Sequence, residues 1–343
     1  MSTSTAVPAP PGSLDDGVAW HYGDPHGEQR ALVRGRGAVD LGHREVVEVA
    51  GADRLTWLHS LTTAHLLGLA PGDSRLVLIL SPHGHVEHEL HLVETGESVL
   101  VSVEPGAGEA LRSYLDSMRF MMRVEVAARP DLAVVWEPVA ERDPALPTWL
   151  VPGDYRSAEP TPAGADRGGD ATRYAPTRPA DLVGREVLVA RAQAASRVAD
   201  SGAPAGTWAL EALRVAAAVP RLGLETDHRT LPHEVGWIGA GVHLAKGCYR
   251  GQEAVARVHN LGRPPRRLAL AHLDGSVGIL PAHGDEVRIG DRVVGWVGTP
   301  ARHHELGPIA TVILKRSADP SADLVITAAD GEVVAAQEVV IAP

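Results

Sequence analysis

The sequence predicts an α+β fold in which a mixed α/β core is followed by a small C-terminal β-barrel. Three observations support this prediction. A chain of 343 residues exceeds the usual size of one hydrophobic core, so two or three domains are expected. In the first half, the connections between strand-like runs are too short for parallel crossovers, which favours hairpins. After Arg266, short Val- and Leu-rich runs alternate with glycines, which is typical of a small barrel or sandwich.

The expected core begins with a short strand followed by a helix. Asp53 is a good N-cap, and Leu55, Leu58 and Leu61 then recur at helical spacing. A turn over 81–84, Ser-Pro-His-Gly, separates two strand-like runs. In order, we expect strands over 46–49, 75–80, 85–93, 97–103 and 124–126, with helices over 54–62 and 108–118.

The middle and the end of the chain differ in composition. Residues 137–181 are rich in Pro, Gly, Ala and Asp, which predicts a surface insertion between two parts of the core, 18–136 and 182–262. A helix with Trp208, Leu210 and Leu213 on it is expected over 207–218. The C-terminal domain, 263–343, is expected to contain strands over 267–273, 286–289, 292–297, 307–314, 323–326 and 333–338.

Composition limits the functions and the compartment. A formal net charge of −11 argues against broad nucleic-acid binding, which needs a basic footprint. The single cysteine forms no internal disulfide, and it cannot alone hold an iron–sulfur cluster, which needs about four such ligands. Residues 1–17 are expected to be a disordered tail and not a signal peptide, and no apolar run approaches the ~20 residues that cross a bilayer. We therefore expect a cytoplasmic protein.

The octapeptide 246–253, Lys-Gly-Cys-Tyr-Arg-Gly-Gln-Glu, concentrates several chemical groups in one turn. Its glycines permit positive φ and close approach to a ligand. Lys246 offers a cation, and a cation or helix N-terminus near Cys248 favours the nucleophilic thiolate. Gln252 and Glu253 begin a predicted helix over 252–258, where Glu253 could either contact a ligand or complement the helix dipole. A lone cysteine is also compatible with a buried, inert role.

The octapeptide matches the K-G-C-[FY]-x-G-Q-E signature of the YgfZ-type folate-binding proteins, which are related to the aminomethyltransferase of the glycine cleavage system. Segments 20–23, 51–59, 213–225 and 231–234 also resemble this family, and the C-terminal strands are similar to its small barrel. The resemblance implies an aminomethyltransferase-like folate-binding core, with tetrahydrofolate or a derivative as the cofactor. It implies iron–sulfur client proteins or assembly factors as partners.

The resemblance also suggests roles for individual residues. Glu225 occupies the position where the related aminomethyltransferases place a glutamate, and a carboxylate there could pair with two N–H groups of a pterin. Without the family, Glu225 would be interpreted as a solvated loop carboxylate. The candidate catalytic residues are Cys248 and Lys246, and the candidate cofactor-binding residues are Glu225, Lys246, Tyr249, Gln252, Glu253 and Arg257.

Two departures distinguish the chain from the aminomethyltransferases. Their acidic pair is replaced by His88-Glu89, and their R-[IL]-E-[AS]-G step is Arg-Val-Ala-Ala-Ala over 214–218. These changes favour an accessory protein that supports maturation or repair of iron–sulfur enzymes. The alternative is a tetrahydrofolate-dependent aminomethyltransferase or demethylase with Glu89 as acid/base, and a pure interaction module stays open. The His-rich run 83–91 lacks H-E-x-x-H spacing, so no metal site is predicted.

Overall fold

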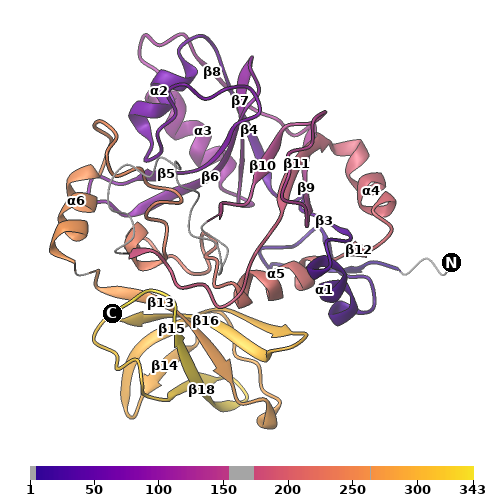
Figure 1. Cartoon of the computed structure of the whole chain (residues 1–343), viewed down its shortest axis with the longest axis vertical. Helices are drawn as coiled ribbons and strands as arrows, with labels where there is room; N and C mark the ends of the chain where they lie inside the picture. The colour runs from indigo at the N-terminus through magenta and orange to yellow at the C-terminus, as the bar shows by residue number, and fades with distance from the viewer. Residues whose placement is uncertain (1–4, 154–173, 263) are drawn as a thin grey trace.

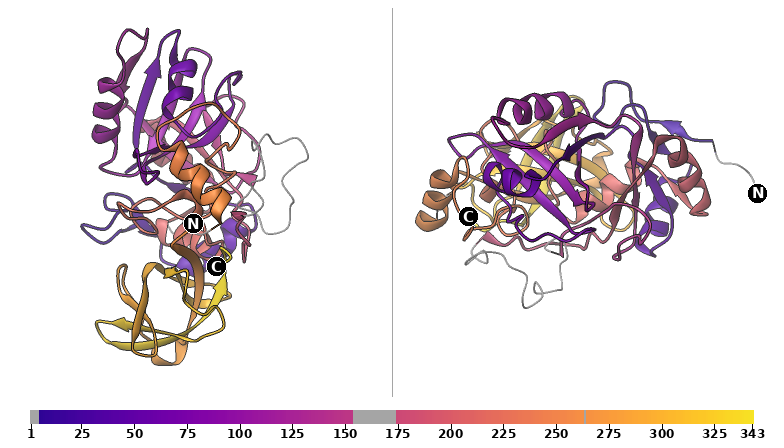
Figure 2. Two further views of the ribbon diagram at one scale, coloured as in Figure 1. Left: turned by 90° about the vertical axis from the view of Figure 1, so that its left-hand side faces the viewer. Right: turned by 90° about the horizontal axis from the view of Figure 1, so that it is seen from above.

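The computed structural model describes residues 5–153, 174–262 and 264–343. In this part of the chain, two five-stranded sheets and a closed barrel form the fold (Figure 1). The barrel lies at one end of the molecule, and it keeps that position in the view turned by 90° (Figure 2). The α+β class with a C-terminal barrel is therefore confirmed.

The first sheet contains the hairpins expected from the sequence. Its order is β5 (Ser74–Leu80), β6 (Val86–Glu94), β7 (Ser98–Val103), β4 (Glu45–Ala50) and β8 (Glu125–Ala128), and its described pairs are antiparallel. Helices α2 (Arg54–Leu61) and α3 (Gly108–Ser117) cover one face, where Val77 and Ile79 pack with Leu58 and Leu111. Alternate residues of β5, such as Leu76 and Leu78, point into the central core because successive side chains leave opposite faces. Both faces of this sheet are therefore buried.

The second sheet was largely missed from the sequence. Its order is β10 (Thr148–Leu150), β11 (Arg185–Ala190), β9 (Leu132–Glu137), β3 (Ala38–Asp40) and β12 (Pro204–Ala205). Three helices lie beside it: α4 (Arg191–Asp200), α1 (Pro25–Val33) and α5 (Thr207–Ala216). Because β9 pairs with β11 along its whole length, strands from both predicted parts of the core share one sheet.

The barrel closes in the order β13 (Arg266–Leu273), β16 (Gly307–Lys315), β15 (Arg292–His303), β14 (Glu286–Ile289), β17 (Leu324–Ala328) and β18 (Gly331–Val339). Ala269, Ala271 and Leu273 of β13 fill its interior, whereas Leu268 and Leu270 pack against the central core. The two faces of β13 therefore pack into two different hydrophobic cores. Three short elements and α6 (Gln252–Leu261) complete the fold: β2 (Ala19–His21), η3 (Pro232–Glu234) and η4 (Gly275–Val277).

Two expectations need correction at their margins. Residues 5–17 belong to the fold, because β1 (Val7–Pro8) pairs with β2 and Asp15 is buried. The rest of the expected tail, residues 1–4, lies outside the described residues. The expected insertion 137–181 contributes β10 near one end, and near the other the backbone N–H of Thr177 donates to the carbonyl of Val340 at 2.8 Å. Its middle, 154–173, also lies outside them. Among the described residues, no helix is long and apolar enough to cross a membrane.

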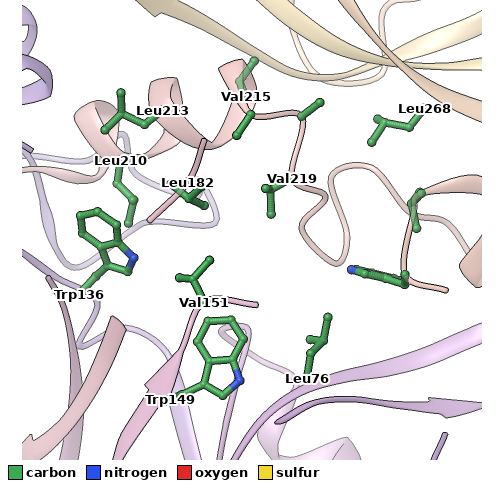
Figure 3. Close-up of a cluster of buried hydrophobic side chains, with 14 of the residues drawn as sticks. Leu76, Trp136, Trp149, Val151, Leu182, Leu210, Leu213, Val215, Val219 and Leu268 are labelled. Carbon is green, nitrogen blue, oxygen red and sulfur yellow. The ribbon is translucent and has the colours of Figure 1, made fainter. Parts of the chain in front are cut away.

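The central core is where the three bodies meet. Figure 3 shows Leu76 of the first sheet, Trp136 and Trp149 of the second and Leu268 of the barrel around one space, with Leu210 and Leu213 of α5 above it. Trp149 and Val151 lie within the expected insertion, and Leu182 directly follows it. These three side chains, together with Trp136 and Leu210, also border the cavity described next.

Candidate functional site

A cavity lies between the second sheet, β6 and α5, and we call it the central cavity. The empty space among its side chains is about 680 Å³ including its mouth, of which the centre of a water molecule can reach about 80 Å³. It is therefore open but narrow. Its lining residues are Asp15, Leu41, His43, Arg44, Glu89, His91, Glu104, Trp136, Trp149, Val151, Leu182, Glu186, Thr207, Leu210, Glu211, Arg214, Val219, Pro220 and Arg221.

One wall of the central cavity is apolar and aromatic. Trp136, Trp149, Val151 and Leu182 are buried there. The ring of Trp149 stacks on the imidazole of His91, with centroids 3.7 Å apart and planes within 3°. The indole N–H donates to the carbonyl of Arg75 at 3.0 Å, which fixes the ring. A flat wall of this kind suits a planar heterocycle.

Another part of the lining carries an ion network centred on Arg221. Its guanidinium reaches Asp15 at 2.8 Å, Glu104 at 2.9 Å and Glu211 at 3.4 Å. Arg44 pairs with the other oxygen of Glu104 at 2.5 Å. Burial alone would raise the pKa of Glu104, but the charges of Arg221 and Arg44 outweigh it and lower that pKa to about 2. The network is therefore ionised.

His91 lies between two carboxylates of the cavity. Its Nδ1 is 2.9 Å from Glu186, and its Nε2 is 3.7 Å from Glu89. Burial opposes a charge on the imidazole, yet the carboxylate of Glu186 outweighs burial and raises the pKa of His91 above its ordinary value. The hydroxyl of Ser102 donates to the second oxygen of Glu186 at 3.0 Å, and the N–H of Leu222 donates to Glu89 at 3.2 Å.

Glu225 lies behind the network and does not line the central cavity. Its carboxylate is fully buried and accepts hydrogen bonds from Thr299 and Thr311, each at 2.5 Å, and from the backbone of Arg221 at 2.8 Å. Arg214 joins it at 3.0 Å and forms a two-point contact with Glu211 at 2.9 and 2.8 Å. These contacts use the lone pairs that a pterin would need. Glu225 thus positions Arg214, and through it Glu211.

Lys246 is buried at the end of α2, away from the central cavity. Its ammonium donates to the carbonyls of His59, Thr62 and Ala64, the last at 3.2 Å, so its three N–H groups satisfy carbonyls that the helix leaves open. Burial lowers the pKa of Lys246 to about 8. This cation therefore supports the loop that carries the cysteine.

The other predicted residues also lie in this loop or on α6. Cys248 is exposed, Tyr249 is buried with its ring 5.1 Å from the Lys246 ammonium, and Gln252 donates to the carbonyl of Lys246 at 3.4 Å. Glu253 and Arg257 are exposed on α6. Within the described residues, none of the octapeptide lines the central cavity. The candidate catalytic residues Cys248 and Lys246 therefore do not line this cavity.

The octapeptide loop is held against the first sheet by two glycines. Gly251 has φ +82°, and a Cβ there would lie 2.5 Å from the carbonyl oxygen of Ser81. Gly84, in the β5–β6 turn, has φ +80°, and its Cβ would lie 2.8 Å from the side chain of Ala254. Only glycines allow this approach of two backbones. Beside it, Arg250 pairs with Glu87 at 2.9 Å.

The sequence did not single out most residues of the central cavity. Asp15, Arg44, Glu104, Glu186, Glu211 and Arg221 come from six separate segments, and nothing local links them. One usable signal exists. Glu186 directly precedes the apolar run of β11, and Glu104 directly follows the apolar β7, at positions where an unpaired charge would be costly.

The chain is similar in sequence to aminomethyltransferases and to YgfZ proteins. No protein-family model matches the chain. An aminomethyltransferase of Bacillus subtilis is 24% identical over 312 residues, which are 82% of this chain and 79% of that protein. An aminomethyltransferase of Rubrobacter xylanophilus is 27% identical over 86% of this chain and 81% of that protein. A tRNA-modifying protein YgfZ of Yersinia enterocolitica is 24% identical over 73% of this chain and 74% of that protein.

The fold is that of an aminomethyltransferase T protein. The crystal structure of the glycine cleavage system aminomethyltransferase T from Bartonella henselae superposes with a TM-score of 0.73, covering 99% of this chain and 94% of that one at 13% identity. The homologues of the chain therefore include both aminomethyltransferases and YgfZ proteins, in agreement with the resemblance found in the sequence.

The glycine contact predicts a graded loss of stability. Gly251→Ala places a Cβ against the Ser81 carbonyl and also strains φ, so it should lower the free energy of unfolding by about 3 kcal/mol. Gly278 has φ +69° with no atom within 4 Å of a Cβ, which makes it a matched control. Gly278→Ala should cost only about 1 kcal/mol. Equal losses in urea unfolding would show that the Ser81 contact is not restrictive.

The His91–Glu186 pair predicts a pH dependence. Because Glu186 raises the pKa of His91, the folded state holds a proton that the unfolded chain releases near pH 6.5. The stability from this pair is complete below that pH and is lost as the pH rises through the raised pKa. Glu186→Gln should remove this decrease, measured as the urea midpoint between about pH 6 and pH 8.

A control separates this effect from other titrations. His272 lies on the barrel, where it pairs with Glu338 at 2.9 Å, so His272→Gln should leave the His91 component of the slope unchanged. Burial lowers the pKa of other histidines, to about 4 for His59 and about 3 for His233. These groups change stability on the acid side of the measured pH range. Parallel curves for the wild type and Glu186→Gln would contradict the assignment.

Proposed function

We propose that the chain binds tetrahydrofolate or a derivative in the central cavity and supports maturation or repair of iron–sulfur enzymes. The observation that carries the proposal is the central cavity itself, which combines a flat aromatic surface with a network of paired carboxylates inside an aminomethyltransferase fold. Relatives named as aminomethyltransferases and as YgfZ proteins support it. Bound tetrahydrofolate would supply a carrier for one-carbon units.

The charges of the central cavity suit a ligand rich in N–H donors. Five carboxylates and three guanidinium groups line it, so acceptors outnumber fixed cations. A pterin presents a row of N–H groups along one edge. Glu211 and Glu186 line the cavity, and each of their oxygens has one described hydrogen-bond partner, which leaves a second lone pair for these groups. Trp149 stacked on His91 offers the surface for its ring. These residues take over the contact first expected of Glu225, which acts through Arg214.

Entry requires the apolar wall to open, because the present space is smaller than a folate. Trp149 belongs to β10, and Val151 directly follows it. This strand has three residues and lies at the edge of its sheet. The strand is held by its pairing with β11 and by the N–H of Leu150, which donates to the hydroxyl of Ser74 at 3.1 Å. The bonds from Trp149 to the carbonyl of Arg75 and from Val151 to the carbonyl of Gly184 must also break for this wall to move.

The octapeptide loop would serve the second half of the function. Cys248 is exposed at the surface beside Glu253 and Arg257 on α6, where a client protein or assembly factor could reach its thiol. Lys246, Tyr249 and Gln252 would hold the loop in shape for that contact. Folate binding and the cysteine would then act at separate places in the molecule.

A second candidate is a tetrahydrofolate-dependent aminomethyltransferase or demethylase. It is favoured by Glu89, which lines the central cavity and could act as acid or base. Against it, one oxygen of Glu89 accepts from Leu222 and the other faces a His91 whose pKa is raised. Tetrahydrofolate incubated with a panel of methylamine donors labelled in the methyl group separates the two, because a transferase moves the labelled carbon to the folate and releases the amine. Label on the folate, abolished by Glu89→Gln, would establish the transferase.

Glu211 provides a test of folate binding. Glu211→Gln replaces an acceptor with a donor facing the pterin edge, and should weaken tetrahydrofolate binding by about 10-fold or more in calorimetry. Because Glu211 also pairs with Arg214, the unfolding midpoint of the variant must be measured beside its affinity. Glu338→Gln, on the exposed face of the barrel, is the matched control and should bind as the wild type does. Unchanged affinity in a folded Glu211→Gln would remove Glu211 from the site.

Cys248 provides a test of the cellular role. Since its side chain is exposed, Cys248→Ser should retain the stability and the tetrahydrofolate affinity of the wild type. In cells that lack the native protein, this variant should fail to restore the activity of iron–sulfur enzymes, whereas the wild type restores it. Full rescue by the serine variant would show that the thiol is dispensable, and the function would then rest on folate binding alone.

A further inference from the structure

We infer that the N-terminal segment completes the ligand site: Asp15 orients His43 so that the free Nδ1 of the imidazole accepts a hydrogen bond from the molecule bound in the central cavity. The inference rests on the proposed folate binding and adds a contact to it. It assigns a role to a histidine outside the octapeptide and to a segment expected to be disordered.

His43 occupies the joint between the two sheets. It lies in the turn between β3, in the second sheet, and β4, in the first, and it lines the central cavity. Only 4% of its side chain is exposed, and its Nε2 lies 3.2 Å from Oδ1 of Asp15. The same oxygen is 2.8 Å from the guanidinium of Arg221. The imidazole is thus held from one side by a residue of the N-terminal segment.

The carboxylate of Asp15 determines which nitrogen carries the proton. Burial alone would raise the pKa of Asp15, but the hydrogen bond from His43 and the charge of Arg221 outweigh it and hold that pKa well below its usual range. An ionised carboxylate can only accept, so the neutral imidazole donates from Nε2. Its Nδ1 is then left with a lone pair.

That lone pair has no partner in the part of the chain that the structure describes. Among the described residues that line the central cavity, Nδ1 of His43 is the buried polar side-chain atom that no donor or acceptor reaches. The charged groups around it are engaged: Arg221 with Asp15 and Glu104, and Glu186 with His91. Since a buried acceptor without a donor is costly, an N–H or O–H group of the ligand is favoured at this atom.

The arrangement also distinguishes His43 from the other imidazole of the cavity. His91 is held between Glu186 and Glu89 and stacked on Trp149, so both of its nitrogens face carboxylates. It can donate but has no lone pair free for a ligand when charged. Nδ1 of His43 is therefore the imidazole acceptor that the cavity offers when this ring carries a single proton, and His91 supplies the stacking platform.

Nitrogen NMR on protein with ¹⁵N-labelled histidine tests the inference directly. The His43 resonances are assigned by their loss in His43→Gln, and spectra are recorded at about pH 8, where an ordinary imidazole is neutral. The free protein should show the proton on Nε2 and an unprotonated Nδ1. Addition of tetrahydrofolate should shift the Nδ1 resonance, as acceptance of a hydrogen bond does.

Variants add a binding readout. His43→Gln should weaken tetrahydrofolate binding by about 10-fold in calorimetry, in line with loss of one buried hydrogen bond. Asp15→Asn keeps the shape of the partner but removes its charge, so it should move part of the His43 population to the tautomer with the proton on Nδ1, with a smaller loss of affinity. His272→Gln, on the barrel, is the control and should change neither readout.

The outcomes separate this inference from the proposed function. If the wild type binds tetrahydrofolate while the Nδ1 resonance stays fixed and His43→Gln binds equally well, the inference is wrong and folate binding stands. A proton on Nδ1 in the free protein overturns the orientation by Asp15. If the wild type binds no reduced folate, the proposed function fails and this inference fails with it.

Discussion

The buried guanidinium of Arg221 is the contact on which the arrangement of the core depends. It binds carboxylates from three distant parts of the chain: Asp15 of the N-terminal segment, Glu104 after β7 and Glu211 of α5. A buried cation is costly without partners, and removal of one partner of a buried pair is more destabilising than its formation is stabilising. The three segments are therefore bound to one position, and the space between them stays polar.

This constraint explains why a cavity exists in a region that hydrophobic packing would otherwise fill. Both faces of the first sheet are buried, and the barrel contributes Leu268 to the same core. Ion pairs at Arg221, Arg214 and His91 line the same cavity as Trp136 and Trp149, and although His91 packs on Trp149, space remains between the other charged groups and the indoles. The polar groups are fixed in advance, so a ligand that matches them loses little free energy in ordering the site.

Local patterns in the sequence were sufficient for part of the fold. The spacing of Leu55, Leu58 and Leu61 gave α2 to within one residue at its end, and the alternating runs gave the hairpins and the barrel strands. The second sheet was harder, because β3 and β12 have three and two residues and carry no periodic signal. The octapeptide was recognised in the sequence as a motif, but a local motif does not show how far its side chains lie from a cavity. Lys246 proved to be bonded to the end of α2, and the partners of Arg221 are separated by long stretches of chain.

The two-sided strand β13 has a consequence for how the chain can be divided. Its Leu268 and Leu270 belong to the central core, and Thr299 and Thr311 of the neighbouring barrel strands hold Glu225 beneath the cavity. A cut at the start of the barrel would expose an apolar wall on the remaining fragment and leave a buried carboxylate without its hydroxyl donors. In the sequence the barrel resembles a separate domain, yet in the structure its strand β13 forms one side of the central core. Insertions and fusions are better tolerated at the far rim of the barrel, in the turns that face away from that core.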